Sequence, residues 1–138
     1  MQKPKCYDIP DEFWYPKNSG YKELQVYRLT MSKTCVQQND FLSLYELHKK
    51  QGKIRQDLLD DDRYYGISLY ESYEDIEKLF RKVKAKNLKG ISKGKTMISD
   101  GLVRYTPKNN DSHCTWWLFE HAEPEKYFNS LMEDNSNE

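Results

Sequence analysis

The spacing of apolar residues changes its period along this chain, and that change limits the folds the chain can adopt. Residues 24–31 alternate along a strand, with Val26 and Arg28 on one face and Tyr27 and Leu29 on the other. Residues 40–51 instead place apolar side chains three and four apart, which is typical of an amphipathic helix that Asn39 or Asp40 caps and that Gly52 ends. A strand is therefore followed by a helix.

The same order is repeated in the middle of the chain. Residues 64–71 predict a second strand, with Ile67 and Leu69 on one face. Ser72 and Asp75 have the spacing of a capping box, and Ile76 begins the apolar stripe of a second helix that runs to residue 86 or so.

The last third of the chain predicts short strands at residues 91–93, 96–99, 102–106 and 113–119. Asp100 and Gly101 form a hairpin signal, and Pro124 is placed to open a short C-terminal helix. The fold class predicted from these elements is α+β: a single domain with a strongly bent, mainly antiparallel sheet, two main helices and a short C-terminal helix.

The chain has 138 residues, which suits one domain. We expect an irregular N-terminal arm at residues 1–22, because it is rich in proline, then one α+β domain at 23–132 and a disordered tail at 133–138. No apolar run is long enough to cross a bilayer and the start lacks the apolar region of a signal peptide, so we expect a cytoplasmic protein without a membrane partner. The three cysteines are expected to be free thiols, and no metal site is indicated.

Acids and bases balance overall at 22 each, but they are distributed unevenly. Residues 78–95 carry lysines and arginines without an acid, whereas residues 120–138 hold six acids against one base, Lys126. One interpretation is that these runs are solvated surfaces that offset one another. The other is a basic groove that binds the phosphates of a nucleotide or of RNA. The sequence leaves both open.

Polar side chains on strands that otherwise look buried are the main candidates for function, because burying a polar group costs free energy unless it is paired or used. Arg28 is the first: its planar guanidinium suits a phosphate or carboxylate, and the alternative is a structural partner. Ser68 and Tyr70 follow Gly66 on one strand face, where they are placed to contact a ribose or a base. A structural role is equally open for both.

The strand at residues 113–119 offers a third group. His113, Thr115 and Trp117 share one face and combine an imidazole, a hydroxyl and a stacking surface. His48 and His121 are interpreted as structural histidines. A triad with Cys114 is discounted, because adjacent strand residues point to opposite faces.

Several segments between residues 24 and 119 resemble small uncharacterised bacterial proteins. They are Val-Tyr-Arg-Leu-Thr (26–30), Asn-Asp-Phe-Leu-Ser (39–43), Tyr-Gly-Ile-Ser-Leu-Tyr (65–70), Lys-Gly (93–94), Asp-Gly-Leu-Val-Arg-Tyr-Thr (100–106) and His-Cys-Thr-Trp-Trp (113–117). More loosely, a strand arginine, a helix and a Gly-x-Ser-x-Tyr strand resemble the first half of ADP-ribosyltransferase-like folds.

That second resemblance implies NAD as the cofactor. Arg28 would hold the NAD phosphate or ribose, and Ser68 and Tyr70 would line the nicotinamide pocket. The catalytic glutamate of the superfamily has no direct counterpart, so His113 or Glu120 would take its role. Whether any reaction is catalysed stays open.

The leading hypothesis is a cleft that binds a nucleotide-like small molecule, with His113 and Glu120 as candidate catalytic residues and five ligand-binding residues: Arg28, Ser68, Tyr70, Thr115 and Trp117. A protein of this size and pattern fits an ADP-ribosyltransferase-like toxin of a toxin–antitoxin pair or a phage-related effector. One alternative is a non-enzymatic module that holds a protein partner through exposed aromatic side chains, Trp14 and Tyr15 among them. Another is RNA binding through residues 78–95.

Overall fold

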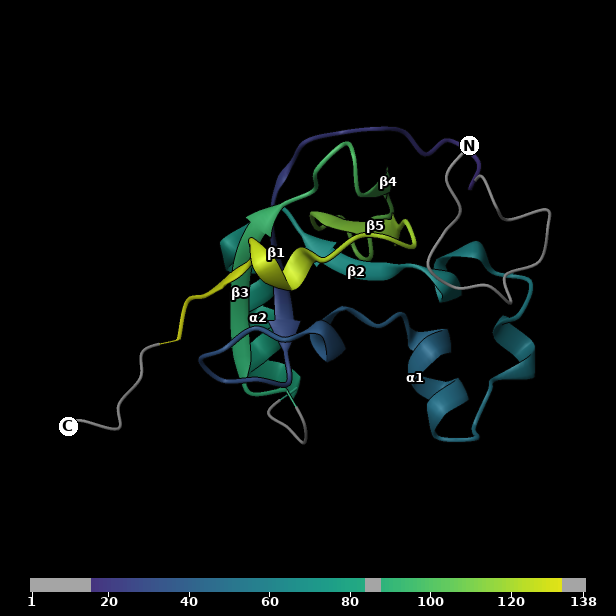
Figure 1. Cartoon of the computed structure of the whole chain (residues 1–138), viewed down its shortest axis with the longest axis horizontal. Helices are drawn as coiled ribbons and strands as arrows, with labels where there is room; N and C mark the ends of the chain where they lie inside the picture. The colour runs from purple at the N-terminus through teal and green to yellow at the C-terminus, as the bar shows by residue number, and fades with distance from the viewer. Residues whose placement is uncertain (1–15, 84–87, 133–138) are drawn as a thin grey trace.

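The computed structural model describes residues 16–83 and 88–132, and these form one antiparallel sheet with two α-helices (Figure 1). The strand order is β4-β5-β2-β1-β3-β6. The strands are β1 (Gln25–Thr30), β2 (Ile67–Tyr70), β3 (Gly90–Lys95), β4 (Gly101–Tyr105), β5 (His113–Leu118) and β6 (Asn129–Ser130). Every pairing between neighbours is antiparallel, which confirms the α+β class and the antiparallel sheet expected from the sequence.

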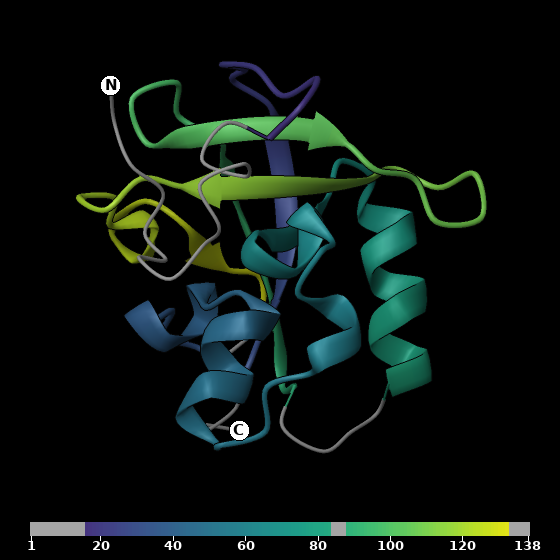
Figure 2. The same cartoon turned by 90° about the vertical axis from the view of Figure 1, so that its right-hand side faces the viewer.

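The sheet is strongly twisted. In Figure 2, β4 and β5 run across the view while β1 runs crosswise to them. The change of direction falls between β1 and β2, whose regular pairing is confined to Tyr27 opposite Tyr70. By contrast, β1 pairs with β3 along its whole length, from Gln25 opposite Lys95 to Thr30 opposite Gly90. The sheet therefore opens between β1 and β2.

Helix α1 (Leu44–Lys50) begins later than the sequence indicated. Ser43 caps it, because its hydroxyl accepts a hydrogen bond from the Glu46 amide and the Glu46 carboxylate accepts one from the Ser43 amide. The predicted cap, Asp40, instead lies in a 3₁₀ turn, where its buried carboxylate accepts bonds from the backbone of residues 31, 32 and 37. Phe41 is therefore not part of the helical stripe and packs in the core.

Helix α2 (Tyr73–Val83) begins where the sequence predicted. The Ser72 hydroxyl accepts a hydrogen bond from the Asp75 amide, which is half of a capping box. The Asp75 carboxylate accepts from the Ser112 amide instead of closing the box, and this bond ties the helix to the start of β5. The predicted end of the helix at residues 84–86 lies outside the described residues.

The described residues also form four 3₁₀ turns: η2 (Gln38–Phe41), η3 (Gln56–Leu58), η4 (Asp62–Tyr65) and η5 (Pro124–Lys126). The strand predicted at 64–71 is thus a turn followed by the shorter β2. The predicted C-terminal helix is only the turn η5, after which β6 pairs with β3. The packing of Phe128 explains why the segment pairs with β3 and does not continue as a helix. The Phe128 ring occupies the space that a side chain on Gly94 would need, since its Cδ1 lies 2.4 Å from the position of a Cβ on Gly94.

The hairpin predicted at Asp100–Gly101 is wrong. The strand predicted at 96–99 is absent, since β3 ends at Lys95 and residues 98–100 form a turn, and β4 pairs with β5 through the loop at 106–112. The two residues have tertiary roles instead. A Cβ on Gly101 would lie 2.5 Å from the Trp116 indole nitrogen, and the Asp100 carboxylate accepts a hydrogen bond of 2.6 Å from the Tyr127 hydroxyl.

The two faces of the sheet are covered differently. One face packs a continuous core of Val26, Phe41, Leu69, Trp116 and Phe128 beneath η2 and the C-terminal segment. The other face is covered in two separate places. One is the packing of α2 on Tyr27, Leu29, Tyr70 and Ile91, and the other is the packing of tyrosines from α1 and η4 on Trp117.

Only the end of the expected N-terminal arm is described, and there Gly20 bridges to Val103 on β4. Residues 1–15, with Trp14 and Tyr15, and residues 133–138 lie outside the described part. Of the cysteines that are described, Cys35 is exposed and Cys114 is buried, and both are free thiols. Within the described ranges, no helix has the length and apolar character needed to cross a bilayer.

Candidate functional site

Arg28 fills the opening between β1 and β2. Its Nε–H donates to the Asp40 carbonyl at 2.8 Å, and its two terminal nitrogens donate to the carbonyls of Ser68 at 2.9 Å and Leu42 at 3.3 Å. The Ser68 carbonyl lies on the edge of β2 that β1 leaves without regular pairing. The guanidinium thus connects β2 to the segment at residues 40–42 by satisfying one backbone carbonyl of the strand and two of the turn.

The positive charge of Arg28 has no carboxylate within ion-pair distance among the described residues. The nearest acid, Asp40, directs its carboxylate to the backbone and hydroxyl of the loop at residues 31–37. Burial lowers the pKa of Arg28 to about 10, and the field of Asp40 offsets only part of that effect. Arg28 is still charged at neutral pH.

A cleft of about 370 Å³ lies beside Arg28, between β2 and β5 on one side and α1, η3 and η4 on the other. Of the seven residues predicted from the sequence, four line it: Arg28, Ser68, His113 and Thr115. The other residues lining the cleft are Leu42, Leu44, Leu47, Leu58, Asp61, Arg63, Tyr64, Gly66, Ile67 and Lys108. Its size and its mixture of apolar walls with a few polar groups are typical of small-molecule sites.

His113 lies at the floor of the cleft and is 3% exposed. Its Nδ1 is 2.8 Å from the carbonyl oxygen of Thr106, which can only accept, so Nδ1 carries the proton of the neutral ring. Its Nε2 is then an acceptor, and it is buried without a hydrogen-bond partner among the described residues. Burial lowers the pKa of His113, so the ring is neutral at neutral pH.

The hydroxyls beside His113 differ in their bonding. Thr115 shares a hydrogen bond of 2.8 Å with the Thr106 hydroxyl, which is also 2.9 Å from the His113 Nδ1. Ser68, opposite Thr115 on the neighbouring strand, is exposed. Gly66 lets the two strands approach here, since a Cβ on it would lie 2.5 Å from the Thr115 methyl group.

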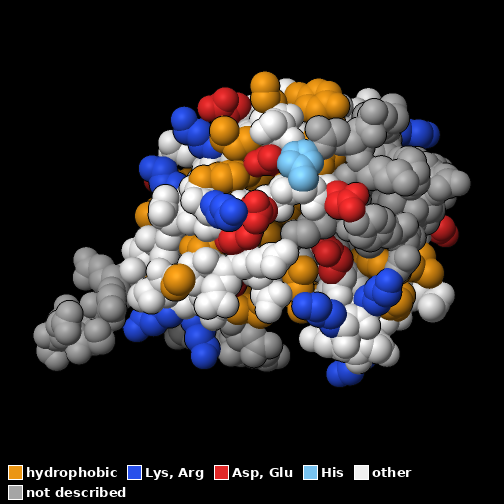
Figure 3. Space-filling model, viewed as in Figure 1, with side chains coloured by type: hydrophobic (Ala, Val, Ile, Leu, Met, Phe, Trp, Pro, Cys, Tyr) orange, Lys and Arg blue, Asp and Glu red, His pale blue; other side chains and the backbone are white. Residues whose placement is uncertain are grey.

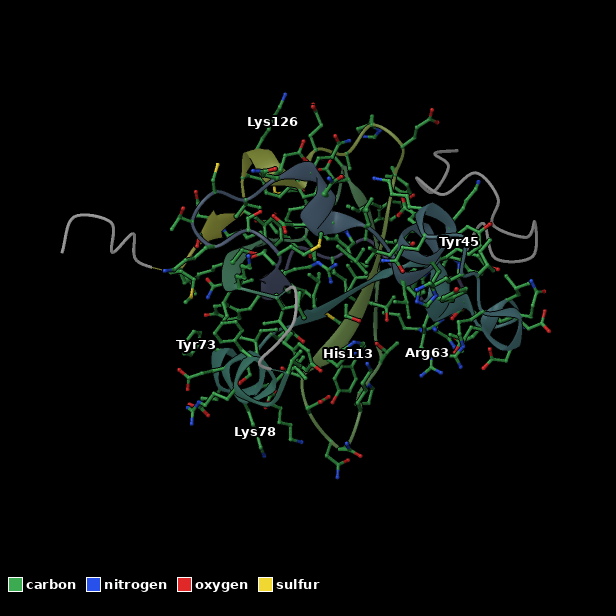
Figure 4. The ribbon with its side chains drawn as sticks, turned by 90° about the horizontal axis from the view of Figure 1, so that it is seen from below. Tyr45, Arg63, Tyr73, Lys78, His113 and Lys126 are labelled. Atoms are coloured by element: carbon green, nitrogen blue, oxygen red, sulfur yellow. The ribbon has the colours of Figure 1, made fainter. Side chains whose placement is uncertain are left out.

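Three charged side chains surround the mouth of the cleft. Arg63 forms a two-point pair with Asp61, with distances of 2.7 and 3.0 Å between their nitrogen and oxygen atoms. This pair lowers the pKa of Asp61 and raises that of Arg63. Lys108 comes from the loop between β4 and β5, and Figure 4 shows His113 and Arg63 near one another, on the side of the sheet away from Lys126. With Arg28, the residues lining the cleft carry more positive than negative charge.

Three of the predicted site residues do not line this cleft. Tyr70 packs among the side chains of β1 and α2 and contacts the His113 ring edge-on at 5.1 Å between ring centroids. Trp117 is fully buried and donates its indole N–H to the Asp62 carbonyl at 2.9 Å. Glu120 is exposed beyond the end of β5. The candidate catalytic pair of His113 and Glu120 is therefore not assembled in one cleft.

No pattern in the sequence indicates Arg63, Lys108 or the leucines of the apolar wall as site residues. Arg63 stands directly before the strand predicted at residues 64–71, and its position in a turn beside Asp61 is set by the Asp61 carboxylate, which caps η4. The sequence feature that could have pointed to Arg63 as a site residue is its closeness along the chain to Gly66 and to the predicted ligand-binding residue Ser68. Lys108 follows Pro107 in a polar loop, and nothing in the sequence relates it to His113.

A second cavity of about 310 Å³ adjoins the first and shares Arg28, Leu44 and Leu47 with it. It lies between α1 and the far ends of α2 and β1, where Val83 and Leu88 line it. Arg28 thus stands in a wall common to both cavities.

The surfaces that would serve the other hypotheses are described only in part, because Trp14, Tyr15, Lys84 and Lys86 lie outside the described residues. Figure 3 shows one face, on which basic, acidic and apolar side chains are interspersed. On α2, Arg81 pairs with Glu77. The exposed aromatics among the described residues, Tyr21, Tyr73 and Tyr105, come from three separate elements.

Comparison of the chain with protein-family models, with curated proteins and with solved structures found no match. The resemblance to ADP-ribosyltransferase-like folds therefore stays a prediction, as does NAD. In the described part of the chain, no three His, Cys, Asp or Glu side chains are grouped so that they could hold a metal ion.

Proposed function

We propose that the cleft beside Arg28 and His113 binds a small, nucleotide-like organic anion. The observation that carries this proposal is the charge of Arg28, which is half-buried in the wall of the cleft and meets three backbone carbonyls but no carboxylate among the described residues. A charge partly withdrawn from water is unfavourable unless something compensates it, and an anionic ligand would add to the compensation that the carbonyls give.

The lining of the cleft supports a ligand with two chemically different parts. Leu42, Leu44, Leu47 and Leu58 offer an apolar surface for a ring system. Arg63 and Lys108 lie at the charged part of the lining, where phosphate oxygens would be favoured. A nucleoside monophosphate combines both features in one molecule.

The proposal concerns binding and not ADP-ribosyl transfer. The superfamily's reaction depends on a glutamate, and Glu120 lies outside the cleft. The carboxylate that does line the cleft, Asp61, is paired with Arg63. NAD remains one of the nucleotides to be tested.

Titration calorimetry at low salt tests the proposal, with adenosine and guanosine monophosphates, NAD and inorganic phosphate as probes. We expect at least one nucleotide to bind, and Lys108→Ala to weaken it about fivefold, since an exposed charge–phosphate contact contributes on the order of 1 kcal/mol. Lys126→Ala is the matched control, because Lys126 pairs with Glu123 away from the cleft and its loss should leave affinity unchanged. If no probe binds, or if both variants weaken binding equally, the proposal is wrong.

A further inference from the structure

We infer that the second cavity, which lies beside α1, is a site for an uncharged aliphatic chain such as that of a medium-length alcohol. The cavity shares Arg28, Leu44 and Leu47 with the cleft, and its other lining residues are different. The inference goes beyond the proposed function, because Arg63 and Lys108, which would hold a phosphate, do not line this cavity.

Apolar side chains form most of the wall of the second cavity. They come from β1 and the residue after it, from α1, from the last turn of α2 and from the segment before β3. The six are Leu29, Met31, Leu44, Leu47, Val83 and Leu88. Among the described residues, no phenyl, phenol or indole ring lines this cavity, whereas Tyr64 lines the cleft. Because flat rings bind best against other aromatic rings, this lining favours an aliphatic chain.

The two charged residues in the described lining, Arg28 and Asp40, have opposite signs and existing partners. The terminal nitrogens of Arg28 bind the carbonyls of Ser68 and Leu42, which line the cleft and not the second cavity. The Asp40 carboxylate is buried and accepts four hydrogen bonds from residues 31–37. A charged group in this cavity would lose hydration and meet balanced charges, so the occupant is uncharged.

The other polar residues of the lining are Asn39, His48 and Gln51. Asn39 and Gln51 are exposed, so they stand where the cavity meets solvent. His48 is engaged on the protein side, since its Nδ1 lies 2.7 Å from the Tyr64 hydroxyl oxygen. A hydroxyl at one end of the chain therefore has side-chain amides to bond at the mouth of the cavity, while its methylene groups lie against the apolar wall.

The size of the cavity sets the length of the chain. Its volume is about 310 Å³, and an apolar cavity of about 150 Å³ holds one benzene-sized molecule, so a chain of roughly eight carbons fits. Each methylene group that leaves water should raise the affinity about threefold to fourfold. The affinity should therefore climb with chain length and stop climbing once the cavity is full.

Methyl NMR of the labelled protein tests this inference, with straight-chain alcohols from butan-1-ol to octan-1-ol as probes. We expect the methyl signals of Leu29, Met31 and Leu88 to shift, and those of Leu58, which lines only the cleft, to stay in place. The affinity taken from these shifts should rise about threefold to fourfold per methylene group. Octanoate should shift the same signals with an affinity about fivefold lower than that of octan-1-ol, because its carboxylate must be dehydrated.

A matched pair of variants assigns the binding to this cavity. Val83→Phe places a ring in the second cavity and should weaken octan-1-ol about tenfold or more, since the ring takes up space that the chain needs. Leu58→Phe places the same ring in the cleft and should leave the affinity for octan-1-ol unchanged. Thermal melting checks that both variants fold, and the methyl shifts of the wild type decide the question if Val83→Phe does not.

Four results would overturn the inference: no shift with any alcohol, shifts spread equally over the cavity and the cleft, an affinity independent of chain length, or an equal loss in both variants. Tighter binding of octanoate than of octan-1-ol at the same methyl groups would also overturn it. If no nucleotide binds, the proposed function fails and this inference stands, because different probes and different methyl signals report on the two sites.

Discussion

Arg104 and Arg28 are two partly buried arginines in adjoining regions of the sheet, and their partners differ. Arg104 meets the Asp62 carboxylate at 2.6 and 2.8 Å and lies 4.9 Å from the centre of the Trp117 ring. Arg28 meets three backbone carbonyls and no carboxylate among the described residues. The first guanidinium has its charge neutralised in a two-point pair, and the second does not.

The neighbouring polar groups also differ between the two regions, in that one is hydrogen-bonded and the other is not. In the Arg104 region the Trp117 indole N–H is satisfied by the Asp62 carbonyl, and aromatic rings of α1 and η4 cover it. Beside Arg28, the His113 Nε2 has no partner in the described part of the chain. One region thus pairs a charge with a carboxylate inside the fold, whereas the other leaves a guanidinium without a carboxylate partner, among the described residues, beside a cavity.

The largest effect is expected from breaking the Arg104 pair. Asp62→Asn keeps the shape of the side chain but removes its charge, which leaves a guanidinium only 20% exposed with the Lys17 carbonyl and the Trp117 ring beside it and without the Asp62 carboxylate. We expect a loss on the order of 2 to 3 kcal/mol in the free energy of unfolding, measured by urea denaturation.

Asp57→Asn is the control for this prediction. It breaks the Arg55–Asp57 pair, whose side chains are 55% and 62% exposed, so the free energy of unfolding should hardly change. Equal losses in the two variants would show that the Arg104 region is not the structural centre inferred here.

A smaller loss is expected at Arg28. Arg28→Met removes donors from three carbonyls, but it also removes a charge whose burial is unfavourable, and the two effects oppose each other. We expect a net loss of about 1 to 2 kcal/mol in urea denaturation.

Added inorganic phosphate sharpens this second prediction. It should raise the melting temperature of the wild type more than that of Arg28→Met, because only the wild type offers a buried charge that lacks a counter-ion. Arg104→Met should keep the full response to phosphate. A response that is lost equally in both variants would remove the distinction between the two arginines.

The smallest effect concerns pH. Burial lowers the pKa of His113 in the folded protein below its ordinary value of 6.5, so the unfolded chain takes up the proton first as the pH falls. The stability due to neutral His113 is complete above pH 6.5 and declines as the pH falls through that value, until the folded form is protonated too.

Urea denaturation between pH 7.5 and 5 measures this third effect as the difference between the wild type and His113→Gln. The other histidines are present in both proteins, and their contributions cancel. A wild type that loses no more stability than the variant over this range would show that His113 is not desolvated in the folded state.

The elements with a strong local signal could be predicted from the sequence. Alternation identified the segments that become β1, β2, β4 and β5, and the spacing of Ser72 and Asp75 identified the start of α2. The elements that the sequence misplaced are those with competing partners. Asp40 is a good helix cap by type, but it binds the preceding loop, and Phe128 packs in the core where a helix had been predicted.

The candidate site divides in the same way. Strand alternation places His113, Thr115 and Trp117 on one face, but only the first two reach the cleft, because η4 and α1 cover Trp117. Arg63 and Lys108 reach the cleft from turns, whose course depends on contacts made elsewhere in the chain. Hydrophobic periodicity and secondary-structure propensity are local properties, so they carry no information about such contacts.

The sequence by itself determined the α+β class, the faces of the strands and the polar residue types at Arg28, Ser68 and His113, because these depend on local spacing. Only the tertiary structure decided the order of the strands, the opening between β1 and β2, and which of the polar groups are satisfied. Those features depend on contacts between residues far apart in the chain, such as the Ser68 carbonyl bound by Arg28. The cleft exists because β1 turns away from β2 after Tyr27, and no local pattern specifies where two strands part.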